Sequence, residues 1–229
     1  MLDSAAPQLV IDSRMLCIGW LPADPDVAVA SVPASLNPRS DRRVIFSQQV
    51  VDDEVQSPGF GAYDLTFLGI ALTETDNVGG VSQSGWGTHC LISSRRLLGH
   101  ARARGIPAMP GRTAIHEQHD KLVTETRLDG VPVIRTSCRI GNTPRAMQSG
   151  HHQHFVRRDG HTTSIVYTYM AELVAPFEIE SVEFLEPEHP IYALRPANPL
   201  DIAWAFYSPR TAFAYPGIAS GNPRIEAGR

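Results

Sequence analysis

Two Asp-Gly pairs, Asp129-Gly130 and Asp159-Gly160, constrain the fold more than any other feature of the sequence. Each pair lies between two segments in which apolar and polar residues alternate, and that combination is typical of a β-hairpin. The segments that flank the two pairs are Lys121–Arg127, Val131–Ile140, His154–Arg158 and Thr163–Leu173. The sequence therefore predicts antiparallel pairing in its second half.

Other short segments are rich in β-branched residues and end at Pro, Asp or Asn clusters, which predicts further strands. They are Met15–Leu21, Val27–Val32, Val44–Val51, Tyr63–Thr73, His89–Ile92, Thr113–His116, Val182–Leu185 and Ala203–Tyr215. One helix is expected over Ser93–Arg104, with Ser93 or Ser94 as N-cap and Gly105 at its C-terminal end. The segment Asn77–Gly87 is rich in glycine and serine and is expected to be a loop that covers a pocket.

The 229 residues fit one domain. We expect a loose tail over 1–14, a single α+β domain over 15–216 and a C-terminal tail over 217–229. The class is mostly antiparallel β.

Composition excludes several classes of partner. A net charge of −4 argues against nucleic acid, which requires a basic face. No apolar run reaches the roughly 18 residues of a membrane span, and Met1–Pro7 lacks the pattern of a secretory signal. Cys17, Cys90 and Cys138 are odd in number and widely spaced, so we expect free thiols in a cytoplasmic protein.

The chain contains a single lysine, Lys121. Arginine cannot form an imine, because its guanidinium stays protonated. Schiff-base chemistry is therefore restricted to Lys121 or the N-terminal amine. Lys121 follows Asp120 at the start of a hairpin, where a lysine is normally solvated.

The order of several motifs is similar to that in acetoacetate decarboxylase. Gly61-Ala62-Tyr63-Asp64 resembles the turn that opens the central strand of that family, and Ser93–Arg104 resembles its helix. Gly105–Met109 and Asp120–Thr124 resemble the two segments that follow. The resemblance covers roughly residues 15 to 216. It implies a cone-shaped antiparallel β-barrel with flanking helices, a pocket inside the cone, no cofactor and a homo-oligomer.

The departures from the family pattern concern its chemistry. The resemblance places the catalytic lysine of the family on Ala108 and the neighbouring lysine, which lowers its pKa, on Met109. One acid of the family falls on Leu65, with Asp64 one position earlier, and a second falls near Gln48 to Val50. The imine machinery is absent, which implies a more apolar and roomier pocket.

The candidate site residues follow from this resemblance and from general chemistry. Histidine titrates near neutrality and suits acid-base work, arginine binds carboxylates or enolate oxygens, and aromatic residues form apolar walls. The candidate catalytic residues are His89, His116, Arg112 and Asp64. The candidate substrate-binding residues are Gln48, Tyr63, Leu65, Trp86, Ala108, Met109 and Cys138.

The run His151-His152-Gln153-His154 is a further candidate. On a strand, His152 and His154 share one face, which is the spacing of a cupin-type metal site. Additional ligands would come from His116, His119, His161 or Glu172. Arg157-Arg158 stands where the cupin pattern has a glutamate, so we expect solvated or hydrogen-bonded surface histidines and no metal.

We therefore expect an enzyme that acts without covalent catalysis on a small, apolar, polyketide-like carbonyl substrate. Cyclase, isomerase, dehydratase and other lyase activities fit, because the superfamily that this chain resembles includes cyclases and aldolase-dehydratases. The alternatives are a non-catalytic ligand-binding module, a decarboxylase or aldolase that uses an unrecognised residue, and a metal-dependent cupin-like oxygenase.

Overall fold

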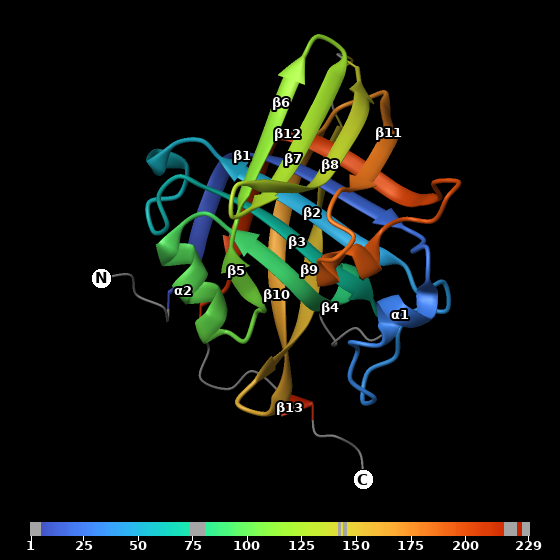
Figure 1. Ribbon diagram of the computed structural model, residues 1–229. Coiled ribbons are helices and arrows are strands. Elements are labelled where there is room, and N and C mark those ends of the chain that lie inside the picture. Colours follow the sequence, from blue (N-terminus) through green and yellow to red (C-terminus); the bar gives the residue numbers. More distant parts are fainter. Residues whose placement is uncertain (1–5, 74–80, 142, 144–145, 218–223, 226–229) are drawn as a thin grey trace.

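The computed structural model describes residues 6–73, 81–141, 143, 146–217 and 224–225. Strands dominate these residues, and a few short helices accompany them (Figure 1). The helical elements are α1 (Pro25–Val29), η1 (Glu54–Gln56), α2 (Arg95–Ala103) and η2 (Pro190–Leu194). The strands are β1 (Gln8–Trp20), β2 (Val44–Val51), β3 (Tyr63–Ala71), β4 (Val81–Ile92), β5 (Ala108–Pro110), β6 (Arg112–Gln118), β7 (Lys121–Leu128), β8 (Val131–Ile140), β9 (Ala146–Arg158), β10 (His161–Leu173), β11 (Phe177–Phe184), β12 (Ile202–Tyr215) and β13 (Arg224–Ile225).

Seven strands close into a barrel in the order β12-β1-β2-β3-β4-β9-β10, and β10 pairs with β12 to complete the ring. All of these pairings are antiparallel except that of β4 with β9. The two α-helices lie on opposite sides of the barrel, α2 on the left and α1 on the right of Figure 1. The predicted fold class, mostly antiparallel β with a barrel and flanking helices, is confirmed.

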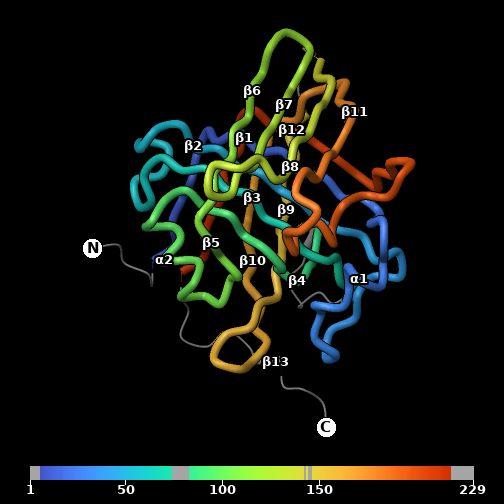
Figure 2. Tube along the Cα trace, in the orientation of Figure 1, coloured from blue at the N-terminus to red at the C-terminus, as the bar shows by residue number. Residues whose placement is uncertain are grey.

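A second sheet of four strands, in the order β11-β8-β7-β6, packs over the outside of the barrel. In the tube view it rises above β1, β2 and β3 (Figure 2). Both predicted hairpins are present: Asp129-Gly130 joins β7 to β8, and Asp159-Gly160 joins β9 to β10. All four turn residues have positive φ, which Asp and Gly tolerate better than other residues.

Two apolar clusters lie on opposite faces of the barrel wall. On β2, Ile45 belongs to the cluster inside the barrel, whereas Val44 and Phe46 belong to the cluster between the wall and the second sheet. Side chains of a strand alternate between its two faces, so a shift of one position moves a residue from one cluster to the other.

Helix α2, which the sequence predicts over Ser93–Arg104, packs against the interior of the barrel. The Ser94 Oγ accepts a hydrogen bond from the Leu97 amide at 3.4 Å, which caps the first turn. Gly105 follows the helix with a φ of 80°, a conformation that glycine adopts at little cost. Leu97 and Ala101 are buried in the interior cluster.

Two local expectations are wrong. Val27–Val32 was expected as a strand, but α1 occupies Pro25–Val29. Asp24 caps this helix by accepting from the Asp26 and Val27 amides at 3.1 Å, and Pro25 stands at the first position, so the start signals outweigh the β-branched content. The loop expected over Asn77–Gly87 is a strand from Val81 onward, whereas 77–80 lie outside the described residues.

The expected tails are shorter where the structure describes them. Strand β1 begins at Gln8, so half of the segment 1–14 belongs to the barrel. Arg224–Ile225, inside the expected tail 217–229, pair with β10. No helix among the described residues has both the length and the apolar character that crossing a membrane requires.

Candidate functional site in the barrel interior

A small chamber of about 60 Å³ lies inside the barrel on the side of α2. Its wall is mostly aliphatic and aromatic, with a few polar groups. The lining residues are Met15, Ser47, Gln49, Leu65, Phe67, Cys90, Ile92, Leu97, His100, Ala101, Ile106, His152, His154, Tyr167, Phe213 and Tyr215. They come from seven strands, from α2 and from the segment that follows it, so the chamber forms only when the barrel closes.

A larger cleft of about 470 Å³ lies at the other end of the barrel. It is lined by Arg39, Arg43, Ile45, Ala71, Leu72, Thr73, Gln83, Ser84, Gln148, His152, Tyr169, Leu173, Trp204, Ala205 and Phe206. His152 lines both spaces, so it stands between them. On β2, Ile45 faces the cleft while Ser47 and Gln49 face the chamber, which orders the two spaces along one strand.

A buried chain of polar side chains crosses one wall of the chamber. The Tyr63 hydroxyl donates to the Gln49 Oε1 at 2.9 Å and lies 3.1 Å from the Tyr215 hydroxyl. The Gln49 Nε2 donates to the Ser13 Oγ at 3.0 Å, and Ser13 donates to the Thr211 carbonyl at 3.1 Å. Gln49 is therefore fixed by its neighbours, and it holds the two phenols in place. Tyr215 presents its side chain to the chamber.

Two of the three histidines that line the chamber, His152 and His154, are uncharged at neutral pH. Burial lowers the pKa of His152 to about 4. Burial, and secondarily the neighbouring His152, lowers the pKa of His154 to about 3. The His154 ring packs 4.3 Å from the Phe67 ring between centroids, and its Nδ1 is buried with no hydrogen-bond partner in the described structure. The part of the His154 ring that solvent can reach faces the chamber.

The remaining ionisable groups of the chamber are driven to their neutral forms as well. Burial raises the pKa of the Cys90 thiol to about 12 and raises those of the Tyr167 and Tyr215 phenols. Burial lowers the pKa of His100 to about 4, with a further contribution from Arg104. The chamber is therefore a mainly apolar, uncharged space with hydrogen-bonding groups on its wall.

Comparison with known proteins supports this architecture at the level of the fold. No protein-family model matches the sequence, and no curated protein matches it significantly. Among solved structures, an acetoacetate decarboxylase superposes with a TM-score of 0.62 at 16% identity, covering 92% of this chain and 87% of that one. The chain has the acetoacetate decarboxylase-like fold.

Two further enzymes share this fold. The enduracididine biosynthesis enzyme MppR, in a complex with pyruvate, has a TM-score of 0.65 at 10% identity, over 96% of this chain and 91% of that one. An acetoacetate decarboxylase-like enzyme from Sphingomonas wittichii has a TM-score of 0.61 at 14% identity, over 98% and 94%. The fold inferred from the sequence resemblance is thus confirmed.

Three of the candidate residues face the barrel interior. Tyr63, Leu65 and Ala108 belong to the interior cluster, and Leu65 lines the chamber directly. Ala108 pairs with Cys90 across the parallel β4–β5 ladder. The position on which the resemblance places the catalytic lysine of the family is therefore a small apolar residue of the interior wall.

Four candidates lie on the opposite face of the wall. Gln48 and Asp64 point toward the second sheet, where Gln48 donates to the Thr126 hydroxyl at 2.9 Å and Asp64 accepts from the Thr113 amide at 2.5 Å. Met109 packs in the outer cluster. The ring of His89 lies 6.4 Å from that of His189, and burial lowers its pKa to about 4. These four residues were expected to face the pocket, but each lies on the opposite face of its strand, one position away from an inward-facing residue.

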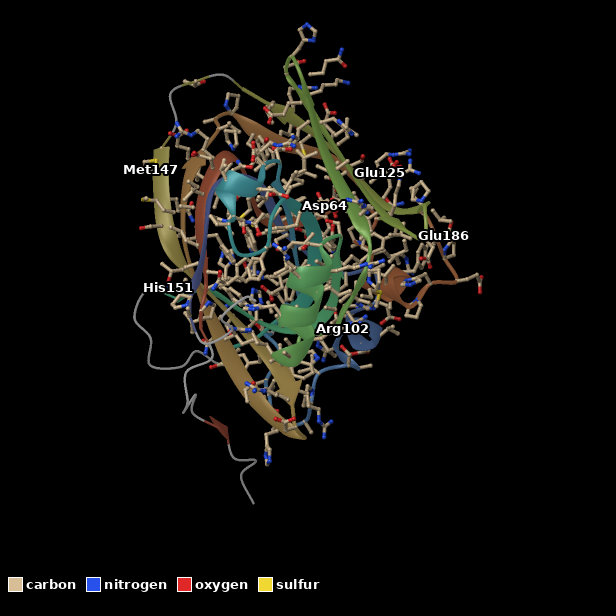
Figure 3. All side chains as sticks on the ribbon, turned by 90° about the vertical axis from the view of Figure 1, so that its left-hand side faces the viewer. Asp64, Arg102, Glu125, Met147, His151 and Glu186 are labelled. Atoms are coloured by element: carbon tan, nitrogen blue, oxygen red, sulfur yellow. The ribbon has the colours of Figure 1, made fainter. Side chains whose placement is uncertain are left out.

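The last four candidates are also outside the chamber. Cys138 is buried in the outer cluster, while His116 and Arg112 are exposed on β6. Arg112 reaches Asp64 at 3.3 Å, so Asp64 and Arg112 meet on the outside of the barrel, where Figure 3 shows Asp64. Trp86 packs with Leu36, Leu72 and Phe155. A bulge between the pairs of Leu68 and Gly69 turns β4, so Trp86 faces outward and Gly85 inward.

Several polar residues that line the chamber were not among the candidate site residues. His152 and His154 were expected at the surface, and this is wrong, because β9 is a wall strand whose inward face they occupy. Their shared face was the available signal. Their neighbour His151 lies on the outer side, as Figure 3 shows together with Met147. No local sequence pattern indicates that Gln49 and Tyr215 face the chamber, because the face of each side chain depends on the register of strand pairing.

The described residues contain no group of three or more His, Cys, Asp and Glu side chains arranged to hold a metal ion. Of the ligands proposed to join His152 and His154, His116 lies on β6, and His119 and His161 are exposed at hairpin ends. All three cysteines are free and buried.

Proposed function

We propose that this protein is an enzyme that enolises a small, mainly apolar carbonyl compound inside the barrel, without a covalent intermediate. The observation that supports it is the pair of neutral imidazoles, His152 and His154, beside the Tyr215 phenol in a chamber with no lysine. For carbonyl compounds with an α-proton, isomerisation, cyclisation, dehydration and other lyase reactions can each begin from such an enol or enolate.

The chamber offers distinct groups for the two halves of this step. A carbonyl oxygen that becomes negative needs hydrogen-bond donors close to it. The N–H of His154 supplies one, and the Tyr215 hydroxyl supplies a second when it turns its proton from the Gln49 Oε1, 3.4 Å away, toward the carbonyl. His152 stands between the chamber and the cleft and accepts the proton from the α-carbon. Its imidazole is a weak base in the empty site, but a developing enolate beside it raises its pKa, because opposite charges attract strongly in a space lined mainly by apolar groups.

The comparison with MppR adds support for the substrate class. Its structure holds pyruvate, a small oxo acid, in an enzyme of the same fold. Apolar residues dominate the chamber wall here, and Ala108 takes the place of an amine that would attack the carbonyl. We therefore assign non-covalent chemistry on a ketone or aldehyde.

Deuterium exchange tests this proposal. Small ketones incubated with the protein in D₂O should exchange their α-protons faster than in buffer, as followed by NMR. His152→Phe and Tyr215→Phe should each slow the exchange by about 10²-fold or more, the usual range for loss of an acid-base or oxyanion group. His151→Gln, a change on the outer face of the same strand, is the matched control and should leave the rate unchanged.

A non-catalytic binding module is the competing interpretation, because all residues of the imine machinery are replaced. In that case ketones would raise the melting temperature of the protein. No ketone in the panel would exchange faster than in buffer, and that result would refute the enzymatic proposal.

A further inference from the structure

The outer cleft carries an unbalanced positive charge. Arg39 and Arg43 line it, and none of the described lining residues is acidic. Asp41 lies between the two arginines in sequence and pairs with both, with Arg39 at 3.6 Å. One carboxylate offsets one of the two guanidinium charges, so the rim keeps a net charge of about +1.

Arg43 is held in one orientation and still has donors to spare. Its Nε donates to the Asp41 Oδ2 at 2.7 Å, and its Nη2 reaches the same oxygen. A guanidinium has five N–H donors in a planar fork, so three remain for a ligand. The Arg43 side chain is 21% exposed, which leaves it partly desolvated and fixed at the cleft. Such an arginine suits a planar carboxylate through paired hydrogen bonds.

An unpartnered hydroxyl lies in the same cleft. Ser84 is 6% exposed, and its Oγ is buried without a hydrogen-bond partner in the described structure. Buried hydroxyl groups are nearly always hydrogen-bonded, so this one points to a partner that a ligand supplies. A carboxylate oxygen accepts from serine and from arginine alike.

A row of rings leads from the cleft to the chamber. Trp204 stacks on Phe206, and Phe206 stacks on Tyr169, each with ring centroids 6.3 Å apart. The Tyr169 ring lies 4.5 Å from the ring of His152, at the boundary of the two spaces. The wall between the arginines and the chamber is therefore apolar and flat, and it favours a hydrocarbon or unsaturated chain.

We propose that cleft and chamber form one site for an oxo-carboxylate: the carboxylate binds at Arg43, Arg39 and Ser84, the chain lies along the aromatic row, and the carbonyl enters the chamber. The volumes support this division. The chamber of about 60 Å³ holds only a short acyl head, whereas the cleft of about 470 Å³ holds the rest of the molecule. Arg43 directly precedes β2, and from Arg43 to Ser47 the extended backbone advances about 13 Å at about 3.3 Å per residue, so several carbons separate the two groups.

This inference rests on the proposed function for the role of the carbonyl, but its test measures binding alone. Calorimetry compares 7-oxooctanoate with 2-octanone, which has a methyl ketone at the end of a similar chain but no carboxylate. The shorter 5-oxohexanoate is paired with 2-hexanone in the same way. At low ionic strength we expect the oxo acid of at least one pair to bind tenfold or more tightly than its ketone, and added salt to reduce the difference.

Three variants locate the effect. Arg43→Gln should reduce the carboxylate preference to threefold or less. Ser84→Ala leaves the charge of the cleft unchanged. It should weaken binding of the oxo acid by about two- to tenfold and leave binding of the ketone unchanged. Arg42→Gln is the matched control, because this substitution removes the same charge one position away. Arg42 pairs with Asp26 and does not line the cleft. The variant should keep the wild-type preference.

The inference is overturned if neither oxo acid binds more than twofold better than its ketone, or if Arg42→Gln lowers the preference as much as Arg43→Gln. The outcome is separate from that of the exchange experiment. Exchange of neutral ketones without carboxylate preference would refute only the assignment of the cleft. Carboxylate preference without exchange would refute only the catalytic proposal.

Discussion

Acidification should destabilise this protein well above the pH at which carboxylates titrate, because the barrel buries neutral imidazoles. His152 and His154 have folded pKa values of about 4 and about 3, against 6.5 for an unperturbed imidazole. As the pH falls below 6.5, the unfolded chain binds a proton on each ring while the folded barrel does not. The unfolded state is then favoured, so stability falls with falling pH until each folded pKa is reached.

The size of the effect follows from the distance between the pH and the unfolded pKa. At pH 5 this distance is about 1.5 units, and each unit corresponds to about 1.36 kcal/mol. Each of the two imidazoles therefore removes about 2 kcal/mol of stability between pH 8 and pH 5, or about 4 kcal/mol for the pair. That is a large share of the 5–15 kcal/mol typical of folded domains.

Urea unfolding of the wild type and of a His152→Phe/His154→Phe double variant, at pH 8 and at pH 5, measures the effect. The loss of stability on acidification should be smaller in the double variant by about 4 kcal/mol. Other titrating groups, including the buried His89 and His100, are present in both proteins and cancel in this comparison. Phe155→Leu, on the same strand, should lower stability at both pH values without changing their difference.

Equal losses in the wild type and the double variant would refute this reasoning. They would show that His152 and His154 have the same pKa values in the folded barrel as in the unfolded chain. The uncharged chamber on which the enolisation proposal depends would then be wrong.

Three further predictions concern Ala108, Gly105 and Gly99. Ala108→Lys would place an amine in the apolar interior wall, where burial lowers its pKa. Borohydride should therefore trap a ketone on the variant but not on the wild type, whose Lys121 is exposed. Trapping on the wild type would contradict the proposed absence of imine chemistry. Gly105→Ala should cost roughly 1–2 kcal/mol or more in urea unfolding, because Gly105 has a φ of 80° and an added Cβ would lie 2.3 Å from the Arg157 carbonyl oxygen. Gly99→Ala, where a Cβ meets nothing within 4 Å in the middle of α2, should instead stabilise by about 0.5–1 kcal/mol, and a loss there would show that α2 is not the helix described.

Local signals in the sequence were sufficient for most elements of the fold. Strand β2 occupies Val44–Val51 as expected, since its β-branched run is closed by acidic residues. The two Asp-Gly hairpins and the Ser94 cap are also where local chemistry puts them. The helix at Pro25–Val29 was missed because a cap and a proline outweighed the valines that follow.

The site was less predictable, because the face of each strand is decided by distant partners. Gln48 and Gln49 are equally polar, yet only Gln49 enters the barrel, where Tyr63 and Ser13 bind it. Nothing within several residues of either glutamine distinguishes them. Likewise, His152 and His154 face inward only because β9 lies in parallel beside β4 and closes the ring with β10.

The alanine at position 108 and the neutrality of the chamber are parts of one arrangement. Position 108 is the ladder partner of Cys90, so a lysine there would lie beside the Cys90 side chain. Its charged form would need acidic groups nearby. The chain places its acid Asp64 on the outer face of the wall instead, where Arg112 and the Thr113 amide bind it. Without a carboxylate beside them, His152 and His154 have pKa values set mainly by burial, with a smaller contribution of His152 to His154, and both remain uncharged. A chamber built this way cannot attack a carbonyl carbon with an amine, but it can polarise a carbonyl oxygen with neutral donors, and that is the chemistry we assign to it.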